Sequence, residues 1–158
     1  MHNTGLAYRR SIRRTVFGVL CLFTAFAARA EVVDIDNATL AKLAASGVPV
    51  IDIRTSPEWE ETGIVPGSHL LTFFDERGKA DPAAWLEKAK GIAKPGEPVI
   101  VICRTGNRTR VLSQFLTQQA GYAKVYNVRN GIVAWGKEGR PIASAAPALA
   151  ACRAASTC

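Results

Sequence analysis

The sequence predicts an α/β sandwich with five strands in a mainly parallel sheet and helices on both faces. Short apolar runs alternate with segments of helical periodicity from residue 32 to residue 141, as expected when helices connect parallel strands. Turn-forming and cap-forming residues separate the two kinds of segment. The chain has 158 residues, of which 48% are hydrophobic, and this size and composition suit one compact domain.

The first two strands are joined by a short helix. Residues 32–35 form an apolar run, and Asn37 can cap a helix that Gly47 ends. The next run, residues 48–53, is continuous and apolar, with one acidic residue near its end. This pattern is typical of a strand that is buried on both faces of a sheet.

Two further helices flank the third strand. Ser56 is the expected cap of a short helix with Pro57 in its first turn. The third strand is predicted over residues 69–73. Asp81 is then positioned to cap a helix over residues 82–93.

The rest of the pattern contains the strand with the most buried character, at residues 98–102. Helical periodicity begins near Arg108 with one apolar stripe, and Gly121 ends it. Residues 125–128 are the predicted fifth strand, and residues 131–137 are a last short helix.

The first thirty residues have the pattern of a secretory signal peptide. Four arginines in residues 9–14 precede thirteen mainly apolar residues, 16–28, and residues 28–30 read Ala-Arg-Ala, a small-x-small cleavage site. A spanning helix needs about 20 apolar residues, so we expect no stable membrane anchor. We expect a mature chain that starts at Glu31 and a periplasmic location. Residues 13–17 also resemble a twin-arginine signal weakly, so the export route stays open.

Charge and histidine content argue against nucleic-acid and metal partners. The formal charge of +7 includes five arginines in the first thirty residues, which contain no acid. Without that segment, 15 basic and 13 acidic side chains remain, so we expect no nucleic-acid partner. His69 is the single histidine after residue 30, and the cysteine spacings lack the paired short intervals of zinc sites. We therefore expect no metal site.

Cys103 is the main candidate for chemistry, because it directly follows the most apolar strand and precedes a helix. In open α/β sheets, ligands bind outside the carboxyl ends of the strands. A loop that leads into a helix points backbone N–H groups inward and favours anions, including a thiolate. Arg104 and Arg108 add positive charge. Gly106 lets the backbone turn, and Asn107 can adopt a left-handed conformation. We therefore expect Cys103 to be a nucleophile near neutral pH.

Several ordered motifs resemble the rhodanese homology family, and the likeness covers most of residues 32–141. The motifs are Val-Ile-Asp-Ile-Arg at 50–54 followed by Glu-Trp at 58–59, Gly-Ile-Val-Pro-Gly-Ser at 63–68, Cys-Arg-Thr-Gly-Asn-Arg at 103–108, and Gly-Ile-Val-Ala-Trp at 131–135 ending in Gly-Arg-Pro at 139–141. Ile64 is a departure, because the family often has histidine there, in a segment that is usually structural. The resemblance implies a rhodanese domain, with a rhodanese-like three-layer sandwich, over residues 31–141.

The resemblance also implies a sulfurtransferase. The Cys103 thiolate would take the outer sulfur of thiosulfate or a similar anionic donor, release sulfite, and hold the sulfur as a persulfide. A thiophilic acceptor such as cyanide or a thiol would then remove it, with no metal or organic cofactor. Arg104 would hold the donor by charge-assisted hydrogen bonds, and the loop amides would stabilise thiolate and persulfide. The expected substrate-binding loop consists of Arg104, Thr105, Gly106, Asn107 and Arg108.

Arg108 has two expected roles. It either binds the donor as well or turns toward Asp52 at the rim and stiffens the loop. Asp52, Arg54 and Glu58 are expected to form a supporting network, since ion pairs at strand ends commonly fix geometry.

Two other functions use similar residues. Cell-cycle dual-specificity phosphatases and arsenate reductases of this fold also place a cysteine in an anion-binding loop, with five residues between cysteine and arginine. Four residues separate Cys103 from Arg108, and the smaller ring favours a single sulfur atom over phosphate. A persulfide carrier or regulatory module that serves a protein acceptor, with little turnover of free thiosulfate, is the second alternative.

Residues 142–158 differ from the rest in composition. Eight of the thirteen residues 143–155 are alanine, with no apolar stripe, so we expect a mobile tail. In an oxidising compartment, Cys152 and Cys158 are expected to form a local disulfide. The alternative is that one of them resolves or protects Cys103.

Overall fold

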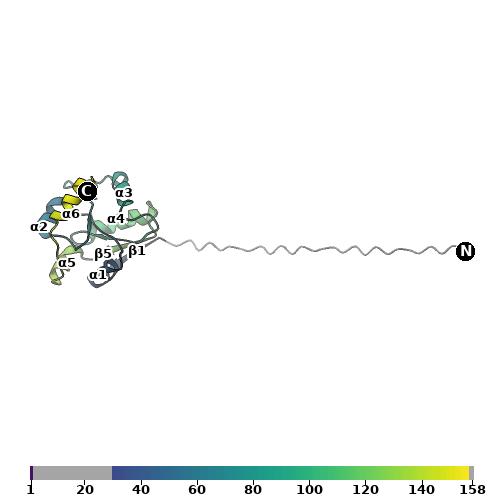
Figure 1. The fold of residues 1–158 in the computed structure, drawn as a ribbon, viewed down its shortest axis with the longest axis horizontal. Coiled ribbons are helices and arrows are strands. Elements are labelled where there is room, and N and C mark those ends of the chain that lie inside the picture. Colours follow the sequence, from purple (N-terminus) through teal and green to yellow (C-terminus); the bar gives the residue numbers. More distant parts are fainter. Residues whose placement is uncertain (2–29, 157–158) are drawn as a thin grey trace.

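The computed structural model describes residue 1 and residues 30–156 (Figure 1). In chain order, the elements are β1 (Glu31–Ile35), α1 (Asn37–Ala45), β2 (Val50–Asp52), α2 (Ser56–Thr62), β3 (His69–Leu70), α3 (Pro82–Ala89), β4 (Val99–Ile102), α4 (Asn107–Gln118), β5 (Lys124–Val128), α5 (Gly131–Lys137) and α6 (Ala146–Ala154).

The five strands form one parallel sheet in the order β1-β5-β4-β2-β3. This confirms the predicted α/β architecture, and the sheet is parallel throughout. β4 lies in the middle of the sheet, and all four of its residues are buried, as its continuous apolar run predicts. The loop that carries Cys103 therefore starts at the centre of the sheet.

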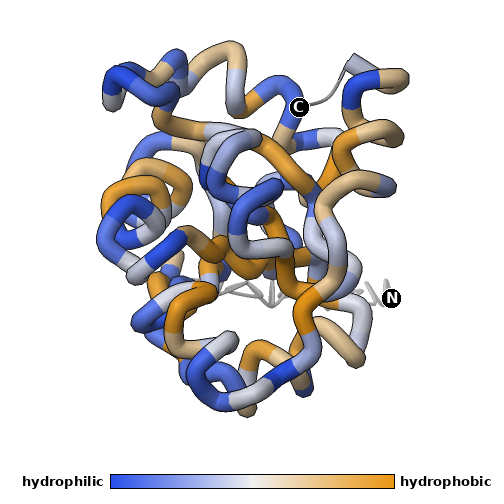
Figure 2. The backbone as a smooth tube through the Cα atoms, turned by 90° about the vertical axis from the view of Figure 1, so that its left-hand side faces the viewer, coloured by the Kyte–Doolittle hydropathy of each residue, from blue (hydrophilic) through white to orange (hydrophobic). Residues whose placement is uncertain are grey.

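Two helices pack on each face of the sheet. Val99 and Val101 of β4 belong to the core cluster that includes α3 and α4. Ile100 and Ile102, which point to the other face, belong to the cluster that includes α1 and α5. Figure 2 shows hydrophobic segments running through the interior and hydrophilic ones mostly at the periphery. Burial of each large aliphatic side chain contributes about 1.5–3 kcal/mol, so these layers hold β4 firmly.

Two helices start with a different cap from the predicted one. Asp36 caps α1, because its carboxylate accepts a 2.8 Å hydrogen bond from a backbone N–H of the first turn. Asn37 is instead the first helical residue and is buried. At α2 the cap is Thr55 rather than Ser56, and the Glu58 carboxylate accepts a hydrogen bond from the Thr55 N–H at 3.1 Å. This reciprocal arrangement is a capping box, which needs an acid three residues after the cap.

The third strand is shorter than the predicted range of residues 69–73, because it ends at Leu70. The N–H groups of Leu71 and Phe73 still donate to carbonyls of the neighbouring chain segment, at 3.1 and 3.2 Å. Both side chains turn into the core beneath α3 and α4. β3 is an edge strand with one neighbour. Its regular hydrogen-bonding pattern ends where the Leu71 and Phe73 side chains pack into the core. α3 also ends four residues before its predicted end, at Ala89.

The segment 142–158 contains a packed helix, so the prediction of a tail without a packing face is wrong. α6 buries Leu149 against Trp59 and Leu70, in a small cluster beside the edge strand β3. Figure 1 shows α6 in yellow next to α2. Alanine-rich sequence hides such a face, because one leucine flanked by small residues carries little apolar periodicity.

Within residues 30–156, no helix has the length and apolar character needed to cross a bilayer. In the same part of the chain, no group of three or more His, Cys, Asp and Glu side chains could hold a metal ion. The predicted signal peptide lies almost wholly outside the described residues, so export and periplasmic location stay predictions.

Candidate active site

The loop after β4 joins the centre of the sheet to the start of α4. Gly106 precedes this helix with a φ of +88°, and a Cβ atom there would lie 3.1 Å from the Asn130 nitrogen and 3.1 Å from the Val128 oxygen. Glycine is therefore needed both for the left-handed backbone and for the close approach of the loop after β5.

From the sequence, Asn107 is a candidate for the left-handed conformation. In the structure the left-handed residue of the loop is Gly106. Asn107 has the backbone of a first helical residue and is exposed, like Thr105. In the neighbouring loop, Asn130 is left-handed with a φ of 71° and directly precedes α5. The tolerance of asparagine for this conformation is thus used, although at another position.

α5 contacts the backbone of the Cys103 loop. The Ile132 N–H donates to the Cys103 carbonyl at 2.9 Å, and the Val133 N–H donates to the Arg104 carbonyl at 3.2 Å. A Cβ atom at Gly131 would lie 2.3 Å from the Cys103 carbonyl oxygen. The start of α5 therefore fixes the two carbonyls of the loop from outside.

The Cys103 thiol is free and buried, with the residue only 1% exposed. The Gly106 N–H donates to Sγ at 3.2 Å, and the Thr109 hydroxyl lies 3.6 Å from Sγ. The predicted inward-pointing amide is thus present at Gly106. A negative charge on sulfur would be stabilised by this N–H and by the positive end of α4.

Arg108 pairs with Glu58 and not with Asp52, the partner that we had considered from the sequence. Two nitrogens of the guanidinium donate to the two carboxylate oxygens of Glu58, at 2.8 and 2.5 Å. Burial opposes ionisation of Glu58, but the hydrogen bonds from Arg108 and from the Thr55 backbone lower the pKa of Glu58 to about 2. The same ion pair, with a smaller contribution from Cys103, raises the pKa of Arg108. Arg108 thus connects α2 to the Cys103 loop.

Asp52 and Arg54 form a second ion pair, which is completely buried. Their shortest contact, from the terminal Arg54 nitrogen to Asp52, is 2.6 Å, and the Nε atom donates to the same carboxylate at 2.9 Å. Arg54 also donates to the Thr62 hydroxyl at 2.6 Å and to the Gly63 carbonyl at 2.8 Å. Arg54 also donates to the Glu58 backbone carbonyl at 3.1 Å, so the structure brings the three predicted supporting residues together and attaches α2 to the end of β2.

Sequence reasoning missed a buried polar chain behind the sulfur. The Thr109 hydroxyl donates to the Asn127 side-chain oxygen Oδ1 at 2.6 Å, and the Asn127 side-chain nitrogen Nδ2 donates to the Asp34 carboxylate at 2.7 Å. Thr109 and Asn127 are both buried. The available signal was a single asparagine inside the otherwise apolar run of β5, because a buried polar group needs a partner.

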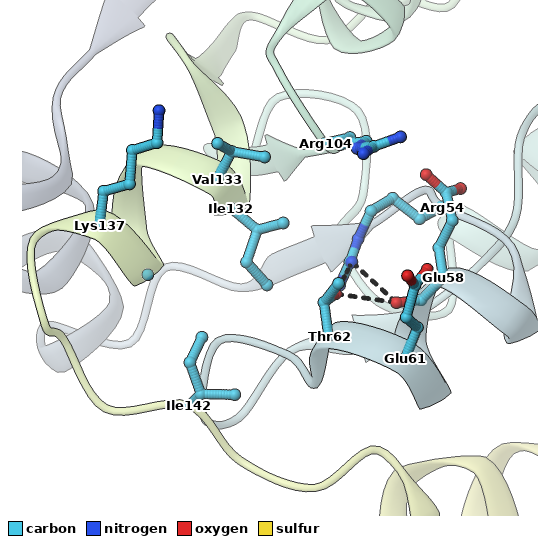
Figure 3. Close-up of a pocket in the computed structure, with 10 residues that line it drawn as sticks. Arg54, Glu58, Glu61, Thr62, Arg104, Ile132, Val133, Lys137 and Ile142 are labelled. Atoms are coloured by element: carbon cyan, nitrogen blue, oxygen red, sulfur yellow. Dashed lines mark hydrogen bonds between the residues drawn. The ribbon is translucent and has the colours of Figure 1, made fainter.

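Arg104 lies on a pocket beside the loop, drawn in Figure 3. The pocket has a volume of about 250 Å³ and lies between α2 and α5. Arg104 is exposed, and among the described residues its side chain makes no ion pair. It is therefore available to an anionic ligand, and donor binding by Arg104 stays a prediction.

Cys152 lies on α6 and packs in a different core cluster from Cys103. Cys152 is disulfide-bonded and packs in the small cluster beneath α6 with Trp59 and Ile64. Cys158 lies outside the described residues, so its pairing with Cys152 stays a prediction. Cys103 is free, and no contact between it and Cys152 is present in the described part of the chain.

The fold and the loop together define a class of protein. It is a parallel α/β domain with a buried cysteine at the carboxyl end of the central strand, in a loop that leads into a helix and whose Gly106 N–H donates to the cysteine sulfur. The chain belongs to the rhodanese-like domain family, whose model matches residues 36–138.

Relatives and solved structures agree with this assignment. The chain is 31% identical over 117 residues to thiosulfate sulfurtransferase 18 of Arabidopsis thaliana, covering 71% of this chain and 84% of that protein. It is 32% identical over 111 residues to a sulfurtransferase of Allochromatium vinosum, covering 69% of this chain and 92% of that protein. A rhodanese-related protein from Thermoplasma volcanium has a similar structure, with a TM-score of 0.53 and 25% identity, over 70% of this chain and 97% of that one.

Proposed function

We propose that this protein is a sulfurtransferase that carries sulfane sulfur as a persulfide on Cys103 and takes it from thiosulfate or a similar anionic donor. The observation that carries the proposal is the Cys103 sulfur, 3.2 Å from the Gly106 N–H, in a loop with two arginines. Two relatives that resemble most of the chain are named as sulfurtransferases, one of them for thiosulfate.

The proposed reaction has two displacements at sulfur. The Cys103 thiolate attacks the outer sulfur of thiosulfate, and the sulfur–sulfur bond breaks with both electrons leaving on sulfite. The resulting persulfide anion keeps its charge within reach of the loop amide and α4. An acceptor thiolate or cyanide then attacks the terminal sulfur, and Cys103 leaves as a thiolate. Charge and electrons balance in each step, and no cofactor takes part.

The two arginines of the loop have different parts in this proposal. Arg104 is exposed and unpaired among the described residues, so it binds the sulfonate end of the donor. Arg108 is engaged by Glu58, at 2.8 and 2.5 Å, and acts as a fixed positive charge beside the sulfur. A phosphatase would need its loop arginine on the substrate phosphate, which the pairing with Glu58 does not favour.

A persulfide carrier for a protein acceptor is the second candidate. The Cys103 residue is only 1% exposed, and this restricted access suits sulfur that is kept for a dedicated acceptor. Steady-state turnover of thiosulfate with cyanide, compared with single-turnover transfer to a protein thiol, separates the two functions. A carrier would load fully with sulfur and yet turn over slowly with cyanide.

Mass spectrometry of the thiosulfate-treated protein tests the proposed function. The peptide that contains Cys103 should gain the mass of one sulfur atom and lose it when cyanide is added. Cys103→Ser should abolish both the label and turnover, because a serine hydroxyl cannot form a persulfide. As the matched control, Cys152→Ser combined with Cys158→Ser should keep most activity. Sulfur found only on Cys152 or Cys158 would contradict the proposal.

We also propose export to the periplasm, on the evidence of the first thirty residues alone. The basic start, the short apolar run and the Ala-Arg-Ala site support a mature chain beginning at Glu31. Amino-terminal sequencing of the protein from a periplasmic extract tests this. A main product that retains Met1 in the cytoplasm would refute it.

A further inference from the structure

The pocket between α2 and α5, which Arg104 lines directly after Cys103 in the chain, has an apolar half that an inorganic donor does not need. Ile132, Val133 and Ile142 line it, and Figure 3 shows Ile132 and Ile142 between α5 and α2. Thiosulfate is a small, strongly hydrated dianion, and it gains nothing from contact with aliphatic side chains. A volume of about 250 Å³ also exceeds the space that so small an anion requires.

Backbone hydrogen bonds connect the apolar half of the pocket to the Cys103 loop. Ile132 and Val133 are the two residues whose N–H groups donate to the carbonyls of Cys103 and Arg104, at 2.9 and 3.2 Å. The pocket wall therefore has a fixed position relative to the sulfur. On the opposite side, Glu58 lines the pocket and binds Arg108, which lies beside the sulfur.

The third apolar residue, Ile142, lies beyond the family match, which ends at residue 138. Ile64 and Ala143 hold this segment, with Ile64 N–H donating to Ala143 at 3.0 Å and Ala143 N–H donating to Ile64 at 2.9 Å. α6 anchors it further, because Leu149 is buried in the cluster beside β3. The packed carboxyl-terminal segment thus provides one wall of the pocket.

The unpaired charges on the pocket favour an anionic ligand. Among the described residues, Arg104, Lys137 and Glu61 line the pocket without making an ion pair, whereas Arg54 and Glu58 are already paired. Two cations against one carboxylate leave a net positive charge. Figure 3 shows Glu61 on α2, across the pocket from Lys137 on α5.

We propose that this pocket is the acceptor subsite, and that it takes an organic thiol with an apolar body and a carboxylate. Ile142 determines the size of the body, and Arg104 and Lys137 receive the carboxylate. This inference rests on the proposed sulfur transfer through Cys103. In the step concerned, the acceptor thiolate attacks the terminal persulfide sulfur, a new sulfur–sulfur bond forms, and the Cys103–sulfur bond breaks to return the Cys103 thiolate.

Single-turnover discharge of the preloaded persulfide tests the proposal. The probes are para-(mercaptomethyl)benzoate, which has both features, benzyl mercaptan, which has only the apolar body, and thioglycolate, which has only the carboxylate. The first should discharge the persulfide with the highest second-order rate constant. Ile142→Ala should lower the ratio of the para-(mercaptomethyl)benzoate rate to the thioglycolate rate about tenfold, since lost apolar contact in a pocket costs this much specificity.

Two charge variants provide an independent test, because removal of a positive charge and removal of a negative charge should change the acceptor ratio in opposite directions. Lys137→Gln should lower the ratio of the para-(mercaptomethyl)benzoate rate to the benzyl mercaptan rate about threefold, and Glu61→Gln should raise it, as expected for partly exposed charges. Val111→Ala is the matched control, because Val111 is an exposed aliphatic residue on α4 that does not line the pocket. It should leave every ratio unchanged.

The outcomes separate this inference from the proposed function. If thiosulfate loads no sulfur on Cys103, the proposed function fails before any acceptor is added. If Cys103 loads and cyanide discharges it, but Ile142→Ala and the charge variants leave the acceptor ratios within twofold of the wild type, the proposed function stands and the acceptor subsite is wrong. If Ile142→Ala proves unstable, Lys137→Gln and Glu61→Gln decide alone, and acceptor ratios within twofold of the wild type in both would still refute the acceptor subsite.

Discussion

The two ion pairs near Cys103 use the same chemical groups in different surroundings. Asp52 and Arg54 are 0% and 1% exposed, and Arg54 gives its other hydrogen bonds to the end of α2. Glu58 and Arg108 have side chains that are 24% and 30% exposed, and Arg108 lies beside the sulfur. The first pair connects two elements of the fold, and the second connects an element of the fold to the site.

This difference in burial indicates what each pair contributes. A buried ion pair contributes little net stability, but removal of one partner leaves an uncompensated charge and is strongly destabilising. A half-exposed pair contributes about 0–1 kcal/mol, so its loss is tolerated by the fold. We therefore expect damage to the first pair to appear in stability and damage to the second to appear in activity.

The largest expected effect is that of Arg54→Met. It leaves the Asp52 carboxylate buried without its partner, and we expect a loss of about 3–5 kcal/mol in the free energy of unfolding. Urea denaturation followed by circular dichroism measures it. The double variant Arg54→Met with Asp52→Leu should recover much of the loss, because no charge is then buried. A loss below 1 kcal/mol in the single variant would remove the distinction between the pairs.

Arg108→Met should lower activity strongly and stability only slightly. Loss of a charge-assisted interaction beside the sulfur should lower kcat/KM for thiosulfate about tenfold or more. The free energy of unfolding should fall by no more than about 1 kcal/mol. Steady-state kinetics and urea denaturation of the same preparation check both expectations. Equal losses of stability in Arg54→Met and Arg108→Met would show that the two pairs have the same role.

Arg104 is the third arginine near Cys103. Unlike Arg54 and Arg108, it has no carboxylate partner among the described residues. Arg104→Ala should raise the KM for thiosulfate about fivefold, the usual effect of one lost charge-assisted hydrogen bond to an exposed group. Rising ionic strength should raise the wild-type KM in the same direction, because salt screens exposed charges. Initial rates at several donor and salt concentrations measure both. Full turnover by Arg104→Ala at low thiosulfate would exclude the assigned role.

The smallest expected effect concerns pH. Burial opposes ionisation of Glu58, but the hydrogen bonds from Arg108 and from the Thr55 backbone lower its pKa from 4.5 to about 2 in the folded chain. The folded state therefore binds fewer protons than the unfolded state between these two pH values. The stabilisation is complete above pH 4.5 and is lost as the pH falls toward 2. We expect less than about 1 kcal/mol for so exposed a pair. In Glu58→Gln, which keeps the capping box, this part of the pH dependence should be absent.

The sequence predicted the sheet well, together with the place of Cys103 after its central strand. Apolar runs and cap residues identify every strand and five of the six helices, because burial and capping act over a few neighbouring residues. The loop of Cys103 follows from the same local pattern. Its glycine, its arginines and its place after the central strand are all contained in six consecutive residues.

The contacts that complete the site join residues that are distant in the sequence, and no local pattern specifies them. Glu58 and Arg108 are 50 positions apart, so the sequence left the partner of Arg108 open between the donor and Asp52. Thr109 and Asn127 are 18 positions apart and come from different elements. α6 was missed because its packing depends on a cluster formed by α2 and the edge strand, and its own sequence is mostly alanine.

The start of α5 determines which backbone groups of the Cys103 loop remain free to face an anion. The carbonyls of Cys103 and Arg104, which could repel an anion, are occupied by N–H groups of α5. In the proposed reaction, an anionic sulfur would therefore meet an amide dipole that is already oriented and need not rearrange at either transfer. The electrical character of the loop is thus set by Gly131, 28 positions further along the chain, where no residue with a Cβ atom fits.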